Sequence, residues 1–357
     1  MSADHINDLA PADAALELHE VQLLAQAGMQ AMSTVLEGKA EALRMAWTIV
    51  LAEGHLLIED VPGVGKTLLA KALGKVVGGT VKRVQFTPDL LPSDVVGVNM
   101  FNQEQHRFEF RPGPVFASIV IGDEINRASP KTQSALLECM AERQASIDGV
   151  THELPNPFMV VATQNPVDME GTYSLPEAQR DRFMAKISIG YPAQDAETDL
   201  LANHAGKDPL KSMQPVCSID KLRRAIQTVH SVTATDALRD YIVRLLAATR
   251  DPSRFSLGAS PRAGIHLLRA SRARAVLEGR DFVLPDDVQA LAQPVLAHRL
   301  IPSRDRQSGA SSVHTTLQEI LASVPVSAER RSPELAVAQL ATPTGRGRRA
   351  PIRSAGE

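Results

Sequence analysis

A short glycine-containing loop near residue 60 carries the residue types that bind nucleotide phosphates. It reads Asp60-Val61-Pro62-Gly63-Val64-Gly65-Lys66-Thr67, directly after the apolar run His55–Ile58. Backbone N–H groups can curl around an anion only where side chains leave room, as glycines do. Lys66 would reach the β- and γ-phosphates, Thr67 would ligate Mg²⁺, and a helix starting there would point its positive end at them. We therefore expect the nucleotide to contact Gly63, Val64, Gly65, Lys66 and Thr67.

The loop departs from the strict phosphate-binding pattern at one position. That pattern, G-x-x-x-x-G-K-[ST], has a glycine where this chain has Asp60. Asp tolerates tight turns, so the substitution is compatible with a working loop. Kinases use the same loop, so the reaction must be inferred from other residues.

Two acids follow a second apolar run, in Ser118-Ile119-Val120-Ile121-Gly122-Asp123-Glu124. Hydrolysis of a γ-phosphate needs Mg²⁺ held by a carboxylate and an attacking water polarised nearby. Asp123, with Thr67, suits the first role and Glu124 suits the second. The alternative is a strand that merely ends at a solvated acidic turn, and the loop favours the catalytic interpretation.

A third apolar run, Phe158–Thr163, ends at Gln164-Asn165-Pro166. An Asn at such a strand end can hold the attacking water, although Asn before Pro is also an ordinary turn former. Ligands of a doubly wound sheet bind at the carboxyl ends of its strands. Asp60, Asp123 and Asn165 all fall at such ends, which favours a functional Asn165.

Two arginines have the character of anion ligands. Arg182, in Leu175-Pro176-Glu177-Ala178-Gln179-Arg180-Asp181-Arg182-Phe183, could enter a neighbouring subunit's nucleotide site, or simply end a helix in solvent. Ser260-Pro261-Arg262 opens a helix, where the macrodipole disfavours arginine, so Arg262 suggests a bound anion. Further along that helix, Arg269, Arg272 and Arg274 fit a solvated face.

Repeated alternation of apolar and helical patterns predicts an α/β fold with a doubly wound parallel sheet. The expected strands are 55–59, 80–86, 118–122, 157–163 and 184–190, with helices at 66–77, 131–144 and 176–183. Two hairpins interrupt them: Val96–Phe101 with Arg107–Phe110, and one that turns at Asp148-Gly149.

The rest of the chain is predicted to be helical, apart from its end. Helices are expected within 14–37 and at 195–205, 218–230, 235–249, 261–278, 285–299 and 314–323. Residues 327–357 are rich in Gly, Pro and Ser and poor in large apolar residues, which indicates disorder.

Composition excludes several classes of function. A net charge of −3 gives no general attraction to nucleic acid, and no apolar run is long enough to span a membrane. The first 38 residues contain six acids and no Lys or Arg, unlike a secretory or transit signal. Two cysteines cannot form a disulfide framework and indicate a reduced, cytoplasmic chain, in which Cys139 is a packing residue. No zinc-binding pattern is present.

The ordered motifs resemble those of AAA+ ATPases, and in particular the MoxR family. The matching segments are Gln85-Phe86-Thr87-Pro88-Asp89-Leu90-Leu91-Pro92-Ser93-Asp94, Gly113-Pro114-Val115-Phe116, Asp123-Glu124-Ile125-Asn126-Arg127-Ala128, Lys131-Thr132-Gln133-Ser134-Ala135-Leu136-Leu137-Glu138 and Ala162-Thr163-Gln164-Asn165-Pro166. The resemblance covers about residues 20–326. It implies a P-loop core followed by a small all-helical lid, and a ring, expected to be a hexamer.

With the composition, the resemblance divides the chain into four parts. These are an acidic helical extension over 1–38, an AAA+ core over 39–192, a lid over 193–326 and a basic tail over 327–357. The core would hold a helix-2 insertion at about 94–113 and a hairpin at about 145–155.

The resemblance also implies roles for single residues. Lys66 and Thr67 would belong to Walker A, and Asp123 and Glu124 to Walker B. Asn165 would be sensor 1, Arg262 sensor 2, and Arg182 an arginine finger that acts on the neighbouring subunit. Arg180 stands where the family has an apolar residue, so it competes for the finger role. Gly122 replaces a small apolar residue and is expected only to loosen the strand end.

The function implied is Mg²⁺-dependent ATP hydrolysis that drives chaperone-like remodelling of client proteins. Proteins similar to this one assist von Willebrand factor A-domain partners and metalloenzymes. One alternative is the motor subunit of a magnesium-chelatase-like complex. Others are a P-loop phosphotransferase, which has no need of Glu124, or a nucleotide-gated binding module. The sequence does not identify the client.

Overall fold

The computed structural model describes residues 15–166, 173–191, 197, 209–303 and 311–326. The helix expected at 195–205, except for residue 197, and the disorder expected over 327–357 lie outside these residues. No helix among the described residues is long and apolar enough to cross a bilayer.

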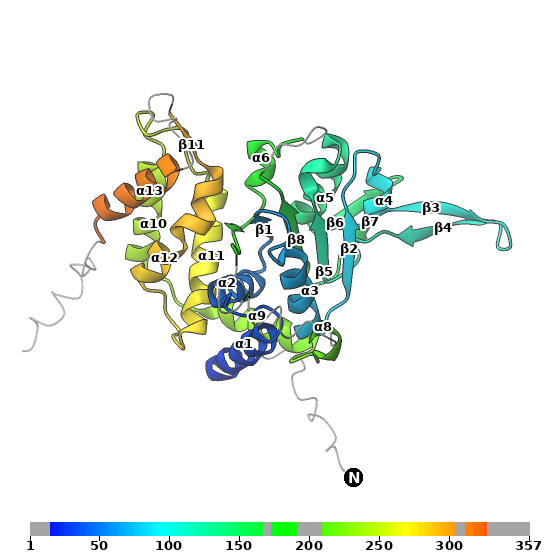
Figure 1. Cartoon of the computed structure of the whole chain (residues 1–357), viewed down its shortest axis with the longest axis horizontal. Helices are drawn as coiled ribbons and strands as arrows, with labels where there is room; N and C mark the ends of the chain where they lie inside the picture. Colours follow the sequence, from blue (N-terminus) through cyan, green and yellow to red (C-terminus); the bar gives the residue numbers. More distant parts are fainter. Residues whose placement is uncertain (1–14, 167–172, 192–196, 198–208, 304–310, 327–357) are drawn as a thin grey trace, which may run out of the picture.

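The centre of the molecule is a five-stranded parallel sheet in the order β2-β5-β8-β1-β9 (Figure 1). Its strands are β1 (Leu56–Glu59), β2 (Val81–Gln85), β5 (Ile119–Asp123), β8 (Met159–Gln164) and β9 (Ala185–Ile187). The three inner strands are almost wholly buried, which explains their continuous apolar runs. The predicted α/β fold is confirmed, although β9 is shorter than expected.

Helices cover both faces of the sheet. One apolar cluster includes α1 (Leu18–Ser33), α2 (Ala40–Leu51) and α3 (Lys66–Val76), and a second includes α5 (Pro130–Glu142). Helix α2 was not predicted from the sequence, because this helix is buried on most sides and lacks the regular polar positions of a surface helix. Its Trp47 is fully buried against Gly28 of α1.

Both predicted hairpins are present. The first pairs β3 (Gly97–Asn102) with β4 (Arg107–Pro112) and projects from the body of the molecule, after the short helix α4 (Pro92–Val96) (Figure 1). The second pairs β6 (Gln144–Ile147) with β7 (Val150–Glu153), and its turn residues Asp148 and Gly149 both have positive φ.

A helical region packs beside the β9 edge of the sheet. Its main helices are α9 (Ile219–Ser231), α10 (Asp236–Ala248), α11 (Pro261–Leu277), α12 (Pro285–Leu296) and α13 (Ser311–Ser323). Smaller elements after β9 are α8 (Pro209–Ser212), β10 (Phe255–Leu257), β11 (Ile301–Pro302) and the 3₁₀ turn η2 (Ala297–Arg299). In the sheet part of the chain, the 3₁₀ turn η1 (Ile125–Arg127) follows β5 and the short helix α6 (Glu177–Arg180) precedes β9. Helix α11 packs against α1 and α2, which therefore join this region to the sheet.

Candidate active site

The phosphate-binding loop connects β1 to α3, as the sequence predicts. Gly63 and Gly65 have φ of +85° and +93°, in the left-handed region that glycine adopts readily. Lys66 donates its ammonium to the carbonyl oxygens of Asp60 and Val61 within the loop. Burial lowers the pKa of this ammonium, and the carboxylates of Asp60, Glu124 and Asp123 limit the decrease. The loop thus places a cation at the N-terminus of α3, an arrangement that can bind phosphates.

Asp60 has a structural role that the sequence analysis missed. Its Oδ2 accepts hydrogen bonds from the Ser188 hydroxyl and from the backbone N–H groups of Ile189 and Gly190, at 2.6 to 2.7 Å. Burial raises the pKa of this carboxyl, but the hydrogen bonds outweigh it and hold the pKa below its ordinary value. Asp60 is therefore more than a tolerated substitution in the loop.

Asp123 lies at the carboxyl end of β5 and is almost fully buried. Its Oδ1 accepts hydrogen bonds from the hydroxyls of Thr67 at 2.9 Å and Thr163 at 3.3 Å. Its Oδ2 accepts one from Nε of Arg83, at 2.6 Å. A hydroxyl and a carboxylate in contact are hard oxygen donors, which fit Mg²⁺ that also binds substrate phosphates. The described residues contain no cluster of three or more His, Cys, Asp or Glu that could hold a metal alone.

Glu124 has a left-handed backbone, with φ of 57° and ψ of 50°. Its backbone N–H donates to the Thr163 hydroxyl at 3.0 Å. Its Oε2 accepts hydrogen bonds from Gln85 at 3.2 Å and from Arg127 at 3.1 Å. Gln85 and Arg127 were not predicted as site residues, although they lie in the family-like segments 85–94 and 123–128.

Asn165 directly follows β8, which lies between β1 and β5 in the sheet. Its backbone oxygen accepts a hydrogen bond from the Asn126 side chain at 3.3 Å. The phosphate-binding loop, Asn165 and the two acids thus follow three adjacent parallel strands. The structure brings these predicted residues to one edge of the sheet, where the doubly wound fold binds its ligands.

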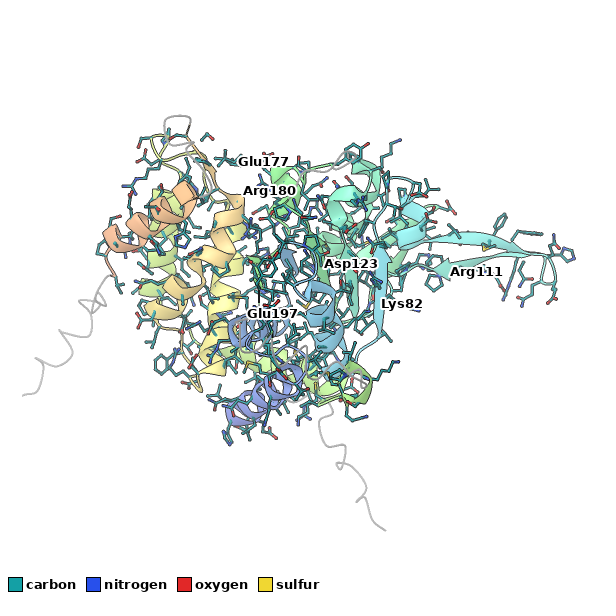
Figure 2. The ribbon with its side chains drawn as sticks, viewed as in Figure 1. Lys82, Arg111, Asp123, Glu177, Arg180 and Glu197 are labelled. Carbon is teal, nitrogen blue, oxygen red and sulfur yellow. The ribbon has the colours of Figure 1, made fainter. Side chains whose placement is uncertain are left out.

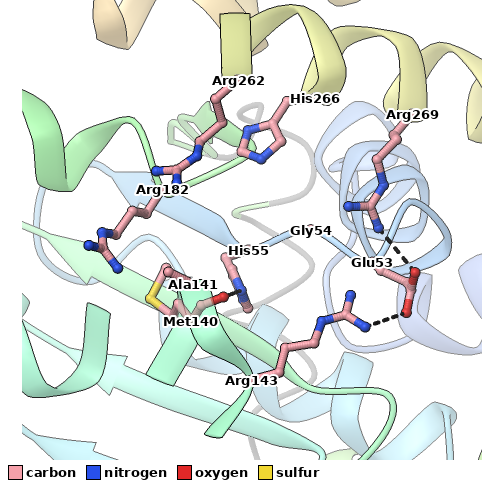
Figure 3. Close-up of a pocket in the computed structure, with 10 residues that line it drawn as sticks. All are labelled: Glu53, Gly54, His55, Met140, Ala141, Arg143, Arg182, Arg262, His266 and Arg269. Carbon is pink, nitrogen blue, oxygen red and sulfur yellow. Dashed lines mark hydrogen bonds and ion pairs between the residues drawn. The ribbon is translucent and has the colours of Figure 1, made fainter. Parts of the chain in front are cut away.

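Arg182 and Arg262 lie together at the opposite end of β1. His55 precedes this strand and Asp60 follows it, and a strand of this length spans about 13 Å. Both guanidinium groups line a cavity of about 140 Å³ at the His55 end (Figure 3). Arg182 donates Nη1 to the carbonyl of Leu137. The structure therefore brings the two predicted arginines to each other, and not to the phosphate-binding loop of the same subunit.

Two further arginines, one glutamate and two histidines also line this cavity. Glu53 accepts hydrogen bonds from Arg143 and Arg269, each at 3.1 Å, which leaves its carboxylate fully engaged. Burial, assisted by nearby arginines, lowers the pKa of His55 to about 4 and that of His266 to about 3. Both histidines are therefore neutral near pH 7.

Two of the arginines expected to be solvated are instead in ion pairs. Arg269 binds Glu53, and Arg274 lies 3.6 Å from the buried Asp287. Among the described residues, Arg182 has no carboxylate within ion-pair distance, and the carboxylate of Asp181 lies 4.0 Å from Arg262. These two guanidinium groups are the least neutralised in the cavity, which makes it suited to an anion.

Arg180 points to a different place. It lies beside Glu177 (Figure 2), at a distance of 3.5 Å. It also lines a polar pocket with Glu59, Gln164 and Lys186. Glu59 and Gln164 end β1 and β8, so this pocket borders the carboxyl ends of the strands. The two candidate finger arginines therefore differ in surroundings, and only Arg182 shares a cavity with Arg262.

Gly122 and Cys139 are explained by packing. A Cβ on Gly122 would lie 2.9 Å from Cε2 of Phe86, so the glycine admits this buried ring and does more than loosen the strand end. Both cysteines are free and buried. Burial raises the pKa of Cys139 to about 12, which leaves it a thiol at neutral pH, as a packing residue should be.

Known families match the two parts of the molecule. Residues 55–185 match the ATPase family associated with various cellular activities (AAA), and residues 247–320 match the AAA lid domain. The crystal structure of a protein assigned as an ATPase from Cytophaga hutchinsonii superimposes with a TM-score of 0.81. It is 36% identical, over 87% of this chain and 97% of that one.

Full-length relatives agree with this result. The uncharacterized protein YeaC of Bacillus subtilis is 45% identical over 84% of this chain and 93% of its own length. Chaperone MoxR1 of Mycobacterium tuberculosis is 39% identical over 90% of this chain and 87% of its own length. Protein MoxR of Paracoccus denitrificans is 34% identical over 76% of this chain and 87% of its own length.

Proposed function

Because this chain belongs to the MoxR family of AAA+ ATPases, we propose that it hydrolyses ATP with Mg²⁺ in a ring of subunits, expected to be a hexamer, and uses the energy to remodel client proteins. ATPase activity follows from the family. The ring, the assignment of single residues and the clients are our proposal.

The phosphate-binding loop and the acids would act within one subunit. Lys66 and the N–H groups from Gly63 to Thr67, Val64 included, would hold the β- and γ-phosphates. Thr67 and Asp123 would hold Mg²⁺, which neutralises charge on the phosphates. Glu124 would take a proton from the attacking water while Asn165 orients it. The hydrogen bonds that Gln85 and Arg127 donate to the Glu124 carboxylate hold its side chain in one orientation, which supports this role.

Arg182 and Arg262 would act on the nucleotide of the neighbouring subunit. The observation that carries this proposal is their shared cavity at the His55 end of β1, while the phosphate-binding loop follows the other end. An interface that joins two different surfaces of identical subunits closes into a ring when its rotation permits. There the two arginines would stabilise negative charge on the transferring phosphoryl group. This context favours Arg182 over Arg180 as the finger.

The clients would be proteins, with von Willebrand factor A-domain proteins and metalloenzymes as the expected classes. The support is the family resemblance and the relative named Chaperone MoxR1. Cytoplasmic location is also part of the proposal, and the two free cysteines are compatible with it. Capture of partners by a Glu124→Gln variant in ATP, compared with capture in ADP, would test the client class.

Mixed assemblies test whether the arginines act between subunits. Glu124→Gln subunits keep Arg182 and Arg262, whereas Arg182→Ala subunits keep the phosphate-binding loop and both acids. We expect each variant alone to release little phosphate and the mixture to recover activity. The matched control mixes Glu124→Gln subunits with Asp123→Asn subunits. Both variants are defective in the acids that act within one subunit, so this mixture should not recover activity. Failure of the first mixture at every ratio, although the variants co-purify, would overturn the proposal.

A further inference from the structure

Asp181, between the two candidate finger arginines, connects the sheet to the helical region. Its Oδ1 accepts a hydrogen bond from Nε of Arg299 at 2.8 Å. The hydroxyl of Ser260 donates to the same carboxylate, at 3.0 and 3.1 Å from its two oxygens. Ser260 is the N-cap of α11, the helix that carries Arg262. Its hydroxyl therefore links the start of this helix to Asp181, which directly precedes Arg182 in the chain.

Arg299 also binds the backbone of the segment that contains Asp181. It is 4% exposed and belongs to η2. Its Nη2 donates to the carbonyl oxygens of Asp181 at 3.1 Å and Phe183 at 2.5 Å, and its Nη1 donates to that of Val295. Burial lowers the pKa of Arg299 to about 10, so the guanidinium stays charged at neutral pH. A buried charge with this many partners holds their backbones in one geometry.

His266 completes the connection. Its Nδ1 lies 2.7 Å from Nη2 of Arg299 and, in the neutral ring, accepts a hydrogen bond from it. His266 is one turn after Arg262 on α11 and lines the cavity that contains Arg182 (Figure 3). The buried guanidinium therefore contacts both the segment that carries Arg182 and the helix that carries Arg262.

We propose that Asp181 and Arg299 are positioning residues that hold Arg182 and Arg262 as one rigid pair, so that both reach the same nucleotide of the neighbouring subunit. The inference rests on the proposed action between subunits and adds the means by which the pair is aligned. An opening of the contact between the sheet and the helical region would separate the arginines and lower hydrolysis without changing the phosphate-binding loop.

The first test is the kinetic effect of Arg299→Met. A loss of alignment of about 1 Å can lower a rate by about 100-fold, so we expect kcat to fall by roughly 10- to 100-fold. The KM for ATP should stay within about twofold, because the phosphate-binding loop is unchanged. Arg299→Lys keeps the charge beside Asp181 and should recover part of kcat. The matched control is Arg280→Met, which breaks an ion pair with the buried Asp287 in the helical region and should keep normal kcat.

Mixed assemblies then distinguish positioning from simple destabilisation. Arg299→Met subunits keep an intact loop, so mixing them with Glu124→Gln subunits, which supply aligned arginines, should restore hydrolysis. Mixing them with Arg182→Ala subunits should not, because both variants lack a working arginine pair. Equal results in the two mixtures, or normal kcat for Arg299→Met alone, would overturn the inference.

A second variant and a comparison between the mixtures keep the test decisive. If Arg299→Met does not fold, Asp181→Asn removes the charge from a more exposed side chain, and the same two mixtures apply. If Arg182→Ala and Glu124→Gln also fail to complement each other, the proposed action between subunits fails. If they complement but Arg299→Met and Glu124→Gln do not, only the positioning inference fails.

Discussion

The carboxylate of Asp60 accepts the backbone N–H of Gly190 at 2.6 Å, which ties the phosphate-binding loop to the segment after β9. Lys39, just before α2, holds the same segment from its carbonyl side, since its ammonium donates to Ile189, Gly190 and Tyr191 at 2.7 to 2.9 Å. The donors and acceptors of one short segment are thus satisfied by two oppositely charged side chains.

We predict that Asp60→Gly destabilises the protein, although it restores the strict loop pattern. It leaves the buried N–H of Ile189 and the partly buried N–H of Gly190 without their acceptor, which costs about 1–3 kcal/mol. The free energy of unfolding in urea measures the effect. Asp220→Asn, which removes an exposed ion pair, is the control and should change it by less than about 0.5 kcal/mol. A stability equal to that of the wild type would contradict the role assigned to Asp60.

The stabilising effect of Asp60 should depend on pH. The pKa of Asp60 in the folded protein is below its ordinary value. Its contribution to the free energy of unfolding is therefore fully present above about pH 4, and it is lost as the pH falls through the folded pKa. The difference in unfolding free energy between wild type and Asp60→Asn should therefore be constant near neutral pH and shrink below pH 4. Urea unfolding at a series of pH values tests this, and a difference that grows in acid would refute it.

Glu124→Gln should separate binding from hydrolysis. The amide has the shape of the carboxylate but cannot take a proton from water, so we expect turnover to fall by about 10²- to 10⁴-fold. ATP affinity should stay near that of the wild type, because Lys66, Thr67 and Asp123 are unchanged. Phosphate release and equilibrium binding of a fluorescent ATP analogue measure the two effects. Unchanged turnover would remove Glu124 from its proposed role.

Arg182→Ala should lower turnover more than Arg180→Ala does. Only Arg182 lies in the cavity with Arg262, whereas Arg180 lies beside Glu177 near the strand ends. We expect a loss of about 10³-fold for Arg182→Ala, with nucleotide binding retained. A larger loss for Arg180→Ala would reverse the assignment.

Catalysis between subunits also predicts that specific activity rises with protein concentration. If the arginines act between subunits, a subunit separated from its neighbours would lack the groups that complete its site. Phosphate release per subunit, measured over a dilution series, should therefore fall at low concentration. The Arg182→Ala variant is the control, since it should show a much weaker dependence. Constant specific activity down to concentrations at which the assembly dissociates would refute the model.

The sequence alone determined the chemistry and most of the elements that carry it. Lys66, Thr67, Asp123 and Glu124 were predicted because phosphate and magnesium binding need particular residue types at short, local spacings. The parallel sheet was predicted because strands buried on both faces read as continuous apolar runs. Helix α2 was missed for a related reason, since a helix buried on most sides loses the polar positions that mark its period.

Only the tertiary structure decided which distant side chains meet. Arg83 reaches Asp123 from the neighbouring strand β2, Asp60 binds a segment more than a hundred residues away, and Arg299 holds Asp181 across a similar separation. Such pairs produce no local pattern in the sequence. Strand order, strand register and the packing of the helical region determine which of these side chains come into contact. The same packing placed Arg182 with Arg262 in one cavity, away from the phosphate-binding loop, and so made two separate arginines the feature that we propose a neighbouring subunit uses.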